Sequence, residues 1–226
     1  MGEVKERMTR LHHEQIYRGS ELIEKLAATP VTICGAGAIG SNLAVNLARM
    51  GANKLTLIDR DRVEERNLGT QVYCVSDVGG RKAEILRNTL YRELGTDCKA
   101  VVQDLTESNM AKLLKGAEIV VDAFDNSGSR KALFEFSQKH SVHCLHAGVN
   151  NEYGEVIWNE NYLVPSDAGE DICDYPLALN IIMFVVSIAS ESLIRFLQSA
   201  EKENYSFTLK DLSINLSSGP SSANDA

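Results

Sequence analysis

Short apolar segments alternate with longer segments in which apolar residues recur every three or four positions. The short segments are rich in Val, Ile and Leu, which favours buried strands, whereas the longer spacing is typical of one face of a helix. Strands are predicted at 30–34, 54–58, 100–102, 117–122 and 142–145. Helices are predicted at 1–29, 41–50, 81–95, 107–115 and 127–139. Strands that alternate with helices predict an α/β fold, a mainly parallel sheet with helices on both faces.

The pattern changes after about residue 150. Residues 155–162 alternate between apolar and polar positions, and 205–215 predict one last strand, so a few antiparallel strands should extend the sheet near the C-terminus. The apolar segment 176–197 contains charged and polar residues, which favours a buried helix over a membrane span. We therefore expect a single domain over 1–215, with an N-terminal helical arm at 1–29, and a disordered tail at 216–226.

Composition narrows the class of protein. The 226 residues carry 23 Lys and Arg against 31 Asp and Glu, a net charge of −8, which argues against a broad basic surface for nucleic acid. The five cysteines are odd in number and widely spaced, and no two form a C-x-x-C pair. A reducing cytoplasm is therefore expected, and a cysteine-rich zinc site is not. The charged N-terminal segment does not resemble a secretory signal.

A glycine-rich turn lies between the first strand and the helix that follows it. The segment GAGAIG places Gly35, Gly37 and Gly40 where a backbone can approach phosphate and where a helix start offers free N–H groups. Asp59 ends the next strand, at a position suited to accept hydrogen bonds from ribose hydroxyls. These residues predict a Rossmann-like nucleotide site. A tight turn that only packs a helix on the sheet is the structural alternative, and an NAD(P)-dependent oxidoreductase is the functional one.

Further motifs follow the glycine turn or precede it in the chain. These are Arg7-Met8-Thr9-Arg10, the stretch from Asp59 to Gln71, Gly79-Gly80-Arg81-Lys82, and Asp122-Ala123-Phe124-Asp125-Asn126 with Arg130 after it. Together they resemble the adenylyltransferases related to ubiquitin-activating enzymes, namely the ThiF/MoeB/HesA family. The similarity runs from about Arg7 to Leu197. A nicotinamide enzyme would explain the glycines and Asp59, but it would not explain Lys82, Asp125 or Arg10.

The resemblance implies an activity. In this family a carboxylate at the end of a small ubiquitin-like or sulfur-carrier protein attacks the α-phosphate of ATP, which yields an acyl-adenylate and pyrophosphate. A carboxylate is already ionised at pH 7, so the reaction needs no general base. It needs aligned groups and neutralised charge instead. The resemblance also implies ATP and Mg²⁺ as cofactors and a homodimer with paired sites.

The resemblance assigns roles residue by residue. Asp59 and Asp61 lie at the ribose side, Asn67 and Lys82 approach the phosphates, and Gln71 belongs to the nucleotide-binding residues. Asp125 matches the aspartate linked to Mg²⁺ and ATP, and Arg10 matches an arginine that reaches the phosphates from the partner subunit. Cys173 stands where many relatives carry a cysteine that accepts the acyl group or joins sulfur transfer.

Simpler roles remain open for the same residues. Lys82 could be a solvated helix lysine, Asp125 a helix N-cap, and Arg10 an ordinary surface charge. Cys173 lies between two aspartates, which would raise the pKa of its thiol unless arginines cover it, so an inert loop cysteine is the alternative. For His143 and His146 a metal site is disfavoured, because an odd separation on a strand sends the two side chains to opposite faces.

One position departs from the family pattern. The family loop usually reads Asn-Leu-x-Arg-Gln, whereas this chain has Thr70 in place of the arginine. That change removes a fixed positive charge, which Arg66 would replace only in part. A degenerate family member that binds ATP as a scaffold therefore stays open. So do two variants within the family: activation of a short peptide or another carboxylate, and dehydration of a modified adenosine in tRNA, which the acidic net charge mildly disfavours.

Overall fold

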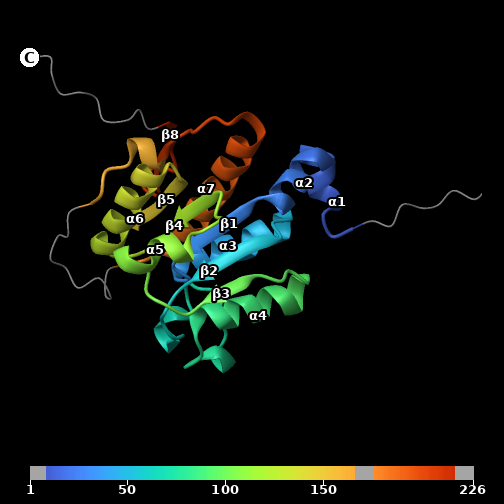
Figure 1. The fold of residues 1–226 in the computed structure, drawn as a ribbon. Helices are drawn as coiled ribbons and strands as arrows, with labels where there is room; N and C mark the ends of the chain where they lie inside the picture. The colour runs from blue at the N-terminus through green and yellow to red at the C-terminus, as the bar shows by residue number, and fades with distance from the viewer. Residues whose placement is uncertain (1–8, 166–175, 217–226) are drawn as a thin grey trace, which may run out of the picture.

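The computed structural model describes residues 9–165 and 176–216 and builds them around one sheet (Figure 1). Within this part, the strand order is β3-β2-β1-β4-β5-β6-β7-β8. The parallel strands are β1 (Pro30–Cys34), β2 (Lys54–Ile58), β3 (Lys99–Val101), β4 (Ile119–Asp122) and β5 (His143–Asn150). The antiparallel strands are β6 (Tyr153–Trp158), β7 (Tyr205–Thr208) and β8 (Ile214–Leu216). The predicted fold class is confirmed.

Helices cover both faces of the sheet, because successive side chains of a strand point to opposite sides. On one face, Val31 and Ile33 of β1 join an apolar core with helices α2, α3, α4 and α7. On the other face, Cys34 and Val120 join a smaller core with α5 and α6. The bounds are α2 (Ser20–Ala28), α3 (Ala38–Met50), α4 (Lys82–Leu94), α5 (Glu107–Leu113), α6 (Ser127–His140) and α7 (Leu179–Ser199).

Several element boundaries differ from the sequence expectation. The region 1–29, expected to be helical, holds two helices in its described part, because Gly19 at φ +86° ends α1 (His12–Arg18) before α2 begins. β5 runs beyond residue 145 to Asn150, since β6 pairs with it in an antiparallel hairpin. The segment 155–162 ends in a 3₁₀ turn, η3 (Asn159–Asn161). The segment 205–215 folds back on itself as the hairpin β7–β8.

Helix α7 is a core helix that has the length of a membrane span. In the described part of the chain it is the one helix long and apolar enough to cross a membrane, and 50% of its most apolar window is buried. Asn46 of α3 donates to Ser190 of α7 at 2.8 Å, and the indole N–H of Trp158 donates to Ser192 at 3.1 Å. These polar contacts join α7 to α3 and to β6, as the predicted buried helix requires.

The crossover of the strand order lies at β1, which has β2 on one side and β4 on the other. At the carboxyl ends of these strands, the backbone N–H of Gly35 donates to Ile58, and that of Ala123 donates to Cys34. The segments that follow β1, β2 and β4 therefore start side by side. In α/β sheets such a crossover edge is where ligands bind. Of the expected tail, Leu216 ends β8, and the remaining residues lie outside the described part.

Candidate nucleotide site

The three glycines of the turn meet three different steric demands. Gly35 has φ +97°, and a Cβ there would lie 2.7 Å from the carbonyl oxygen of Ala123. A Cβ on Gly40 would lie 1.9 Å from the carbonyl oxygen of Gly35, so only glycine lets α3 begin this close to the turn. A Cβ on Gly37 would meet nothing within 4 Å. The open space beside Gly37, at the N-terminus of α3, is suited to an anion such as phosphate.

Asp59 holds the glycine turn in place. Its carboxylate is buried, with Oδ2 accepting from the backbone N–H of Ala36 at 2.7 Å and Oδ1 accepting from that of Asp61 at 2.7 Å. Burial raises the pKa of Asp59, while these two N–H groups and nearby Lys82 act in the opposite direction. Each oxygen can accept a further hydrogen bond, so the predicted contact with ribose remains compatible with this geometry.

Lys82 stands at the start of α4, beside the glycine turn. The side chain is buried, and its Nζ lies 3.8 Å from Oδ2 of the more exposed Asp61. Tyr73 links the two segments, because its hydroxyl donates to the carbonyl of Ala36 at 2.8 Å and lies 3.4 Å from the carbonyl of Lys82. A buried ammonium beside the exposed carboxylate of Asp61, with the buried carboxylate of Asp59 also nearby, suits the neutralisation of phosphate charge. Lys82 is therefore not a solvated surface lysine.

The segment between β2 and α4 is an ordered loop with two 3₁₀ turns, η1 (Glu65–Asn67) and η2 (Val75–Asp77). Asn67 uses its side-chain oxygen within the first turn, where it accepts from the N–H of Glu64 at 2.9 Å. Arg66 pairs with Glu64 at 2.6 Å. The amide of Asn42 on α3 donates to the carbonyl of Thr70 at 2.9 Å, a contact that sequence reasoning missed. Oδ1 of Asn67 is thus engaged within its own turn.

Gln71 lies at the end of this loop. In the described part of the chain its Oε1 is buried and has no hydrogen-bond partner. A buried acceptor without a donor is unfavourable, and a bound ligand with a hydrogen-bond donor would satisfy it. This observation supports the expectation that Gln71 belongs to the binding site.

Asp125 lies on the turn that follows β4. The N-cap of α6 is Asn126, whose side chain accepts from the N–H of Ser129 at 2.8 Å, so Asp125 is left free of the capping role that the sequence allowed. Asp125 is exposed, and the side-chain amide of Asn126 approaches its Oδ1 at 3.5 Å. An exposed carboxylate fits a magnesium ion that takes its other ligands from phosphate and water. In the described residues no group of three or more His, Cys, Asp or Glu is placed to hold a metal alone.

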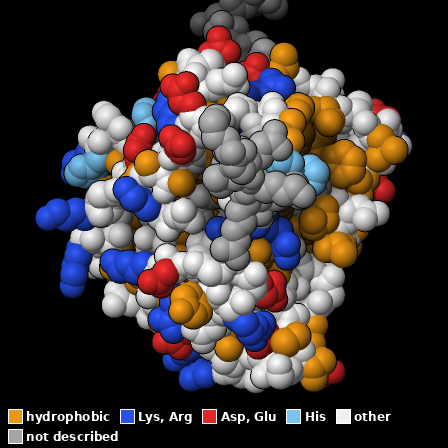
Figure 2. Space-filling model, turned by 90° about the vertical axis from the view of Figure 1, so that its right-hand side faces the viewer, with side chains coloured by type: hydrophobic (Ala, Val, Ile, Leu, Met, Phe, Trp, Pro, Cys, Tyr) orange, Lys and Arg blue, Asp and Glu red, His pale blue; other side chains and the backbone are white. Residues whose placement is uncertain are grey.

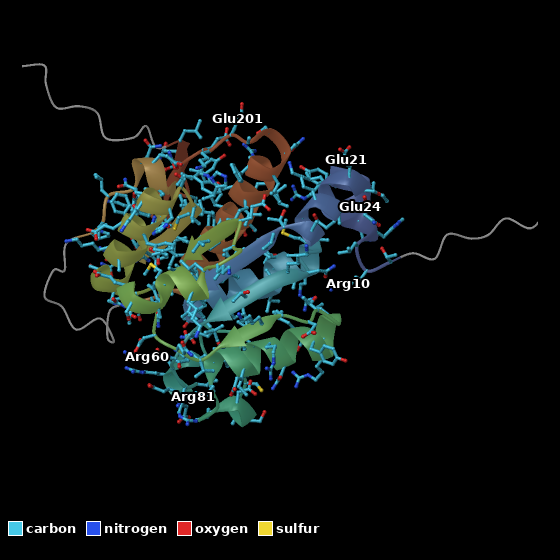
Figure 3. All side chains as sticks on the ribbon, viewed as in Figure 1. Arg10, Glu21, Glu24, Arg60, Arg81 and Glu201 are labelled. Carbon is cyan, nitrogen blue, oxygen red and sulfur yellow. The ribbon has the colours of Figure 1, made fainter. Side chains whose placement is uncertain are left out.

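Arg10 does not join these residues. Its guanidinium lies 3.4 Å from the carbonyl of Ala48 and 3.4 Å from the hydroxyl of Thr96, at the far end of α3. Ala48 is ten residues from the start of α3, about 15 Å along the helix axis. Figure 3 shows Arg10 at one end of the molecule and Arg60 and Arg81 at the other. Arg60 directly follows Asp59, and Arg81 directly precedes Lys82. Any contact of Arg10 with a nucleotide site must therefore be with that of a second copy.

Two predicted features fall outside the described residues, namely Arg7 and Cys173 with its neighbouring aspartates. The other cysteines are free: Cys34, Cys98 and Cys144 are buried, and Cys74 is exposed. The side chains of His143 and His146 point to opposite faces, as predicted. The His143 ring packs on Phe196 of α7, and the His146 ring stacks on Tyr162 on the other face.

Comparison with known proteins identifies the family. The model of the ThiF family matches residues 11–218, nearly the whole chain. The chain belongs to the ThiF family. Curated relatives include the tRNA threonylcarbamoyladenosine dehydratase of Escherichia coli K12, 30% identical over 134 residues, which are 58% of this chain and 50% of the relative. The sulfur carrier protein ThiS adenylyltransferase of Bacillus subtilis is 32% identical over 135 residues, 58% of this chain and 40% of the relative.

Solved structures agree with this ThiF-family fold. The crystal structure of E. coli MccB with MccA-N7isoASN matches with a TM-score of 0.80 at 19% identity and covers 94% of this chain and 72% of MccB. The structure of E. coli MccB with ATP matches with a TM-score of 0.78 at 19% identity, over 96% and 73% of the two chains. At this identity the likeness shows the fold alone. The chain spans about half the length of the curated relatives it matches first.

Proposed function

We propose that this ThiF-family chain is an ATP-dependent adenylyltransferase that activates the C-terminal carboxylate of a small ubiquitin-like or sulfur-carrier protein. The observation that carries the proposal is the convergence of three features at the crossover edge of the sheet: the glycine turn, the buried ammonium of Lys82 and the exposed carboxylate of Asp125. They follow or adjoin β1, β2 and β4, which are neighbours in the sheet.

The proposed reaction divides its tasks among these residues. The glycine turn and the first N–H groups of α3 bind phosphate, and Lys82 neutralises negative charge as the leaving pyrophosphate develops it. Asp59 and Asp61 lie at the ribose, and Gln71 supplies its unpartnered oxygen to the nucleotide. Asp125 would hold Mg²⁺, which screens the phosphate oxygens when bound. The attacking carboxylate arrives ionised, so no residue of the chain needs to remove a proton.

Relatives and structural neighbours support the substrate class without narrowing it. The ThiS adenylyltransferase is named for a sulfur carrier, the dehydratase for a modified tRNA adenosine, and MccB was crystallised with MccA. We favour the protein carboxylate, because the net charge of −8 disfavours a tRNA partner. A nicotinamide oxidoreductase is not favoured, since membership of the ThiF family now accounts for the glycine turn.

The proposal includes a homodimer with paired sites in the cytoplasm. Arg10 sits at the opposite end of α3 from its own glycine turn, so its predicted role requires a second copy. Apolar side chains gather along the right-hand side of the end-on view in Figure 2. Among the described residues the exposed apolar side chains include Ile16 and Tyr17 of α1, and Leu179 and Met183 of α7. Exposed apolar surface of this kind is suited to burial against a second copy.

Pyrophosphate exchange tests the proposed activity. ATP and labelled pyrophosphate are incubated with carriers that end in Gly-Gly, with short peptides that have a free C-terminus, and with tRNA that carries threonylcarbamoyladenosine. We expect exchange with a carrier, and its loss by about 100-fold or more in Lys82→Ala and Asp125→Ala, since each removes a group that acts on the phosphates. Lys131→Ala, an exposed lysine on α6, is the matched control.

The outcomes separate the alternatives. Exchange that survives both Lys82→Ala and Asp125→Ala would refute the site assignment. ATP binding without exchange toward any acceptor would favour the scaffold, for which Thr70 supplies the reason. Exchange with the tRNA alone would instead support the variant in which the chain dehydrates a modified adenosine in tRNA.

A further inference from the structure

Beneath the turn that carries Asp125 lies a cluster of buried polar side chains to which the proposed reaction gives no role. Asp122 ends β4 and His146 lies on β5, and both are 0% exposed. Arg130 of α6 reaches into the same region, with 8% exposed. Charges removed from water are tolerated only where they pair with one another. These three residues are therefore expected to act as one unit.

His146 has acceptors at both ring nitrogens. Its Nδ1 lies 2.7 Å from Oδ2 of Asp122, and its Nε2 lies 2.8 Å from Oδ1 of Asn159. The side-chain amide nitrogen of Asn159 faces the carbonyl of Phe134 at 3.5 Å, which orients its oxygen toward the ring. The ring also stacks on Tyr162, with 3.7 Å between centroids. An imidazole that donates from both nitrogens carries a positive charge.

Arg130 joins the cluster to the turn. Its Nη1 lies 3.8 Å from Oδ2 of Asp122 and donates to the hydroxyl of Tyr162 at 3.1 Å. Its Nη2 donates to the carbonyl of Ala147 at 2.9 Å, and its Nε donates to the carbonyl of Phe124 at 2.8 Å. The planar guanidinium thus contacts β4, β5 and the turn at once, which a lysine ammonium cannot reproduce.

Both polar backbone atoms of Phe124 are held by this cluster. Its N–H donates to Oδ1 of Asp122 at 3.1 Å, and its carbonyl accepts from Arg130. Phe124 is the residue directly before Asp125, and the residue directly after it, Asn126, caps α6. The backbone is therefore fixed on both sides of the exposed carboxylate.

We propose that His146, Asp122 and Arg130 are positioning residues, which hold the Asp125 carboxylate at the place where it meets the nucleotide. This inference rests on the proposed function. Catalysis of phosphoryl and nucleotidyl transfer depends on aligned groups, and a misplacement of about 1 Å can lower a rate about 100-fold. A buried, charged scaffold that no solvent competes for is suited to that precision.

The electrostatics agree with the geometry. Burial lowers the pKa of His146, but Cys144 and Asp122 outweigh it and raise that pKa to about 10. Burial raises the pKa of Asp122, but Arg130 and His146 outweigh it, so the net shift is downward. Glu155 of β6 is the other carboxylate that acts on Arg130. Both members of the pair thus stay charged around neutral pH.

The first experiment measures pyrophosphate exchange in His146→Gln, with His143→Gln as control. His143 lies three positions earlier on β5, on the opposite face, where its ring packs on Phe196 of α7. We expect kcat to fall about tenfold in His146→Gln while KM for ATP stays within about twofold, because the glycine turn and Lys82 are untouched. The control should match the wild type. Unchanged kcat in His146→Gln would overturn the proposal.

A double-mutant cycle tests whether the effect passes through Asp125. If it does, adding His146→Gln to Asp125→Asn lowers the residual rate less than about twofold, because the group to be positioned is already lost. If His146→Gln lowers the rate by the same factor in the wild type and in Asp125→Asn, its effect is a general structural one and the proposal is overturned. If His146→Gln does not fold, Tyr162→Phe replaces it in the cycle, since it removes only the hydroxyl that Arg130 contacts.

Nitrogen NMR of the wild type gives a readout that needs no activity. We expect both ring nitrogens of His146 to be protonated at pH 8, well above the ordinary pKa of a histidine. A neutral His146 ring would overturn the double-donor geometry. If the ring is charged but the wild type exchanges no pyrophosphate with any acceptor, the proposed function fails while the cluster geometry stands.

Discussion

At the scale of single residues, two glycines of the same turn have different roles, one in folding and one in the proposed binding of phosphate. A side chain at Gly40 collides with the backbone of Gly35, whereas one at Gly37 enters open space. The two positions have the same residue type in the same motif, and yet they answer to different constraints. Gly40 serves the packing of α3 on the turn, and Gly37 keeps clear the space into which we place phosphate.

Alanine at each position should show this difference. Gly40→Ala is expected to lower the free energy of unfolding by about 2 kcal/mol or more, since backbone atoms must move. Gly37→Ala should change it by less than about 0.5 kcal/mol and should weaken ATP binding about tenfold. Urea unfolding and calorimetric titration measure the two quantities. Equal ATP affinity in Gly37→Ala and wild type would mean that phosphate binds elsewhere.

The buried charge of His146 predicts a pH-dependent stability. The folded pKa of about 10 lies above the ordinary value of 6.5, so the folded state holds the proton more tightly than the unfolded state. The stabilisation is complete below pH 6.5 and is lost as pH rises toward 10. Urea unfolding should therefore give a difference between wild type and His146→Gln that shrinks by at least about 1 kcal/mol from pH 6 to pH 10. A constant difference contradicts this.

At the scale of elements, the site is assembled from segments that start at neighbouring strands. An antiparallel β-bridge between Arg62 and Arg81 joins the two ends of the loop between β2 and α4. The hydrogen bond from the Tyr73 hydroxyl connects this loop to the glycine turn. Helix α7 covers the sheet face that also carries α3. These contacts fix the positions of β1, β2 and β4 relative to one another. The residues at the ends of these strands are fixed with them.

Helix α7 offers a matched pair of variants. Leu193 is 0% exposed and Met183 is 43% exposed on the same helix. Leu193→Ala is expected to lower the free energy of unfolding by about 2–5 kcal/mol, because it removes packed atoms and leaves a cavity. In the monomer, where its side chain is exposed, Met183→Ala should change it by less than about 1 kcal/mol. Thermal unfolding at a concentration where the protein is monomeric measures both, and similar losses would contradict a helix with one buried and one exposed face.

At the scale of the whole molecule, the position of Arg10 makes its predicted role depend on whether two copies of the chain form a dimer. Its guanidinium lies beside Ala48 and Thr96, about 15 Å along α3 from the turn of its own chain. Either Arg10 serves the site of a partner subunit or it serves no nucleotide site. Exposed Ile16 and Tyr17 lie on α1, close in sequence to this residue.

Mixed dimers decide between these roles. Arg10→Ala and Lys82→Ala are each expected to be inactive as homodimers. In a mixed dimer, the chain with intact Lys82 receives an intact Arg10 from its partner, so one site of two is complete. Random mixing makes half of the dimers mixed, so exchange should return to about a quarter of the wild-type rate. No recovery after subunit exchange, or a strictly monomeric protein in sedimentation, removes the role given to Arg10.

Much of the fold was predictable because local patterns and the parallel sheet agree. Apolar runs with β-branched residues predicted β1, β2 and β4, and the glycine turn predicted that a helix, α3, follows β1. The strand ends were less predictable, since pairing decides them. β5 continues to Asn150 only because β6 returns alongside it, and 205–215 becomes a hairpin because β7 and β8 pair with each other.

The sequence by itself determined the α/β class, the glycine turn with Asp59, and the likeness to adenylyltransferases, because these depend on residues close together in the chain. Tertiary structure decided what those residues contact. It placed Asn67 within its own turn, left Oε1 of Gln71 without a hydrogen-bond partner among the described residues, and gave the capping role to Asn126. It also joined Asp122 to His146, 24 residues apart, since β4 and β5 are neighbours in register. Such pairings follow from strand order, which no local pattern contains.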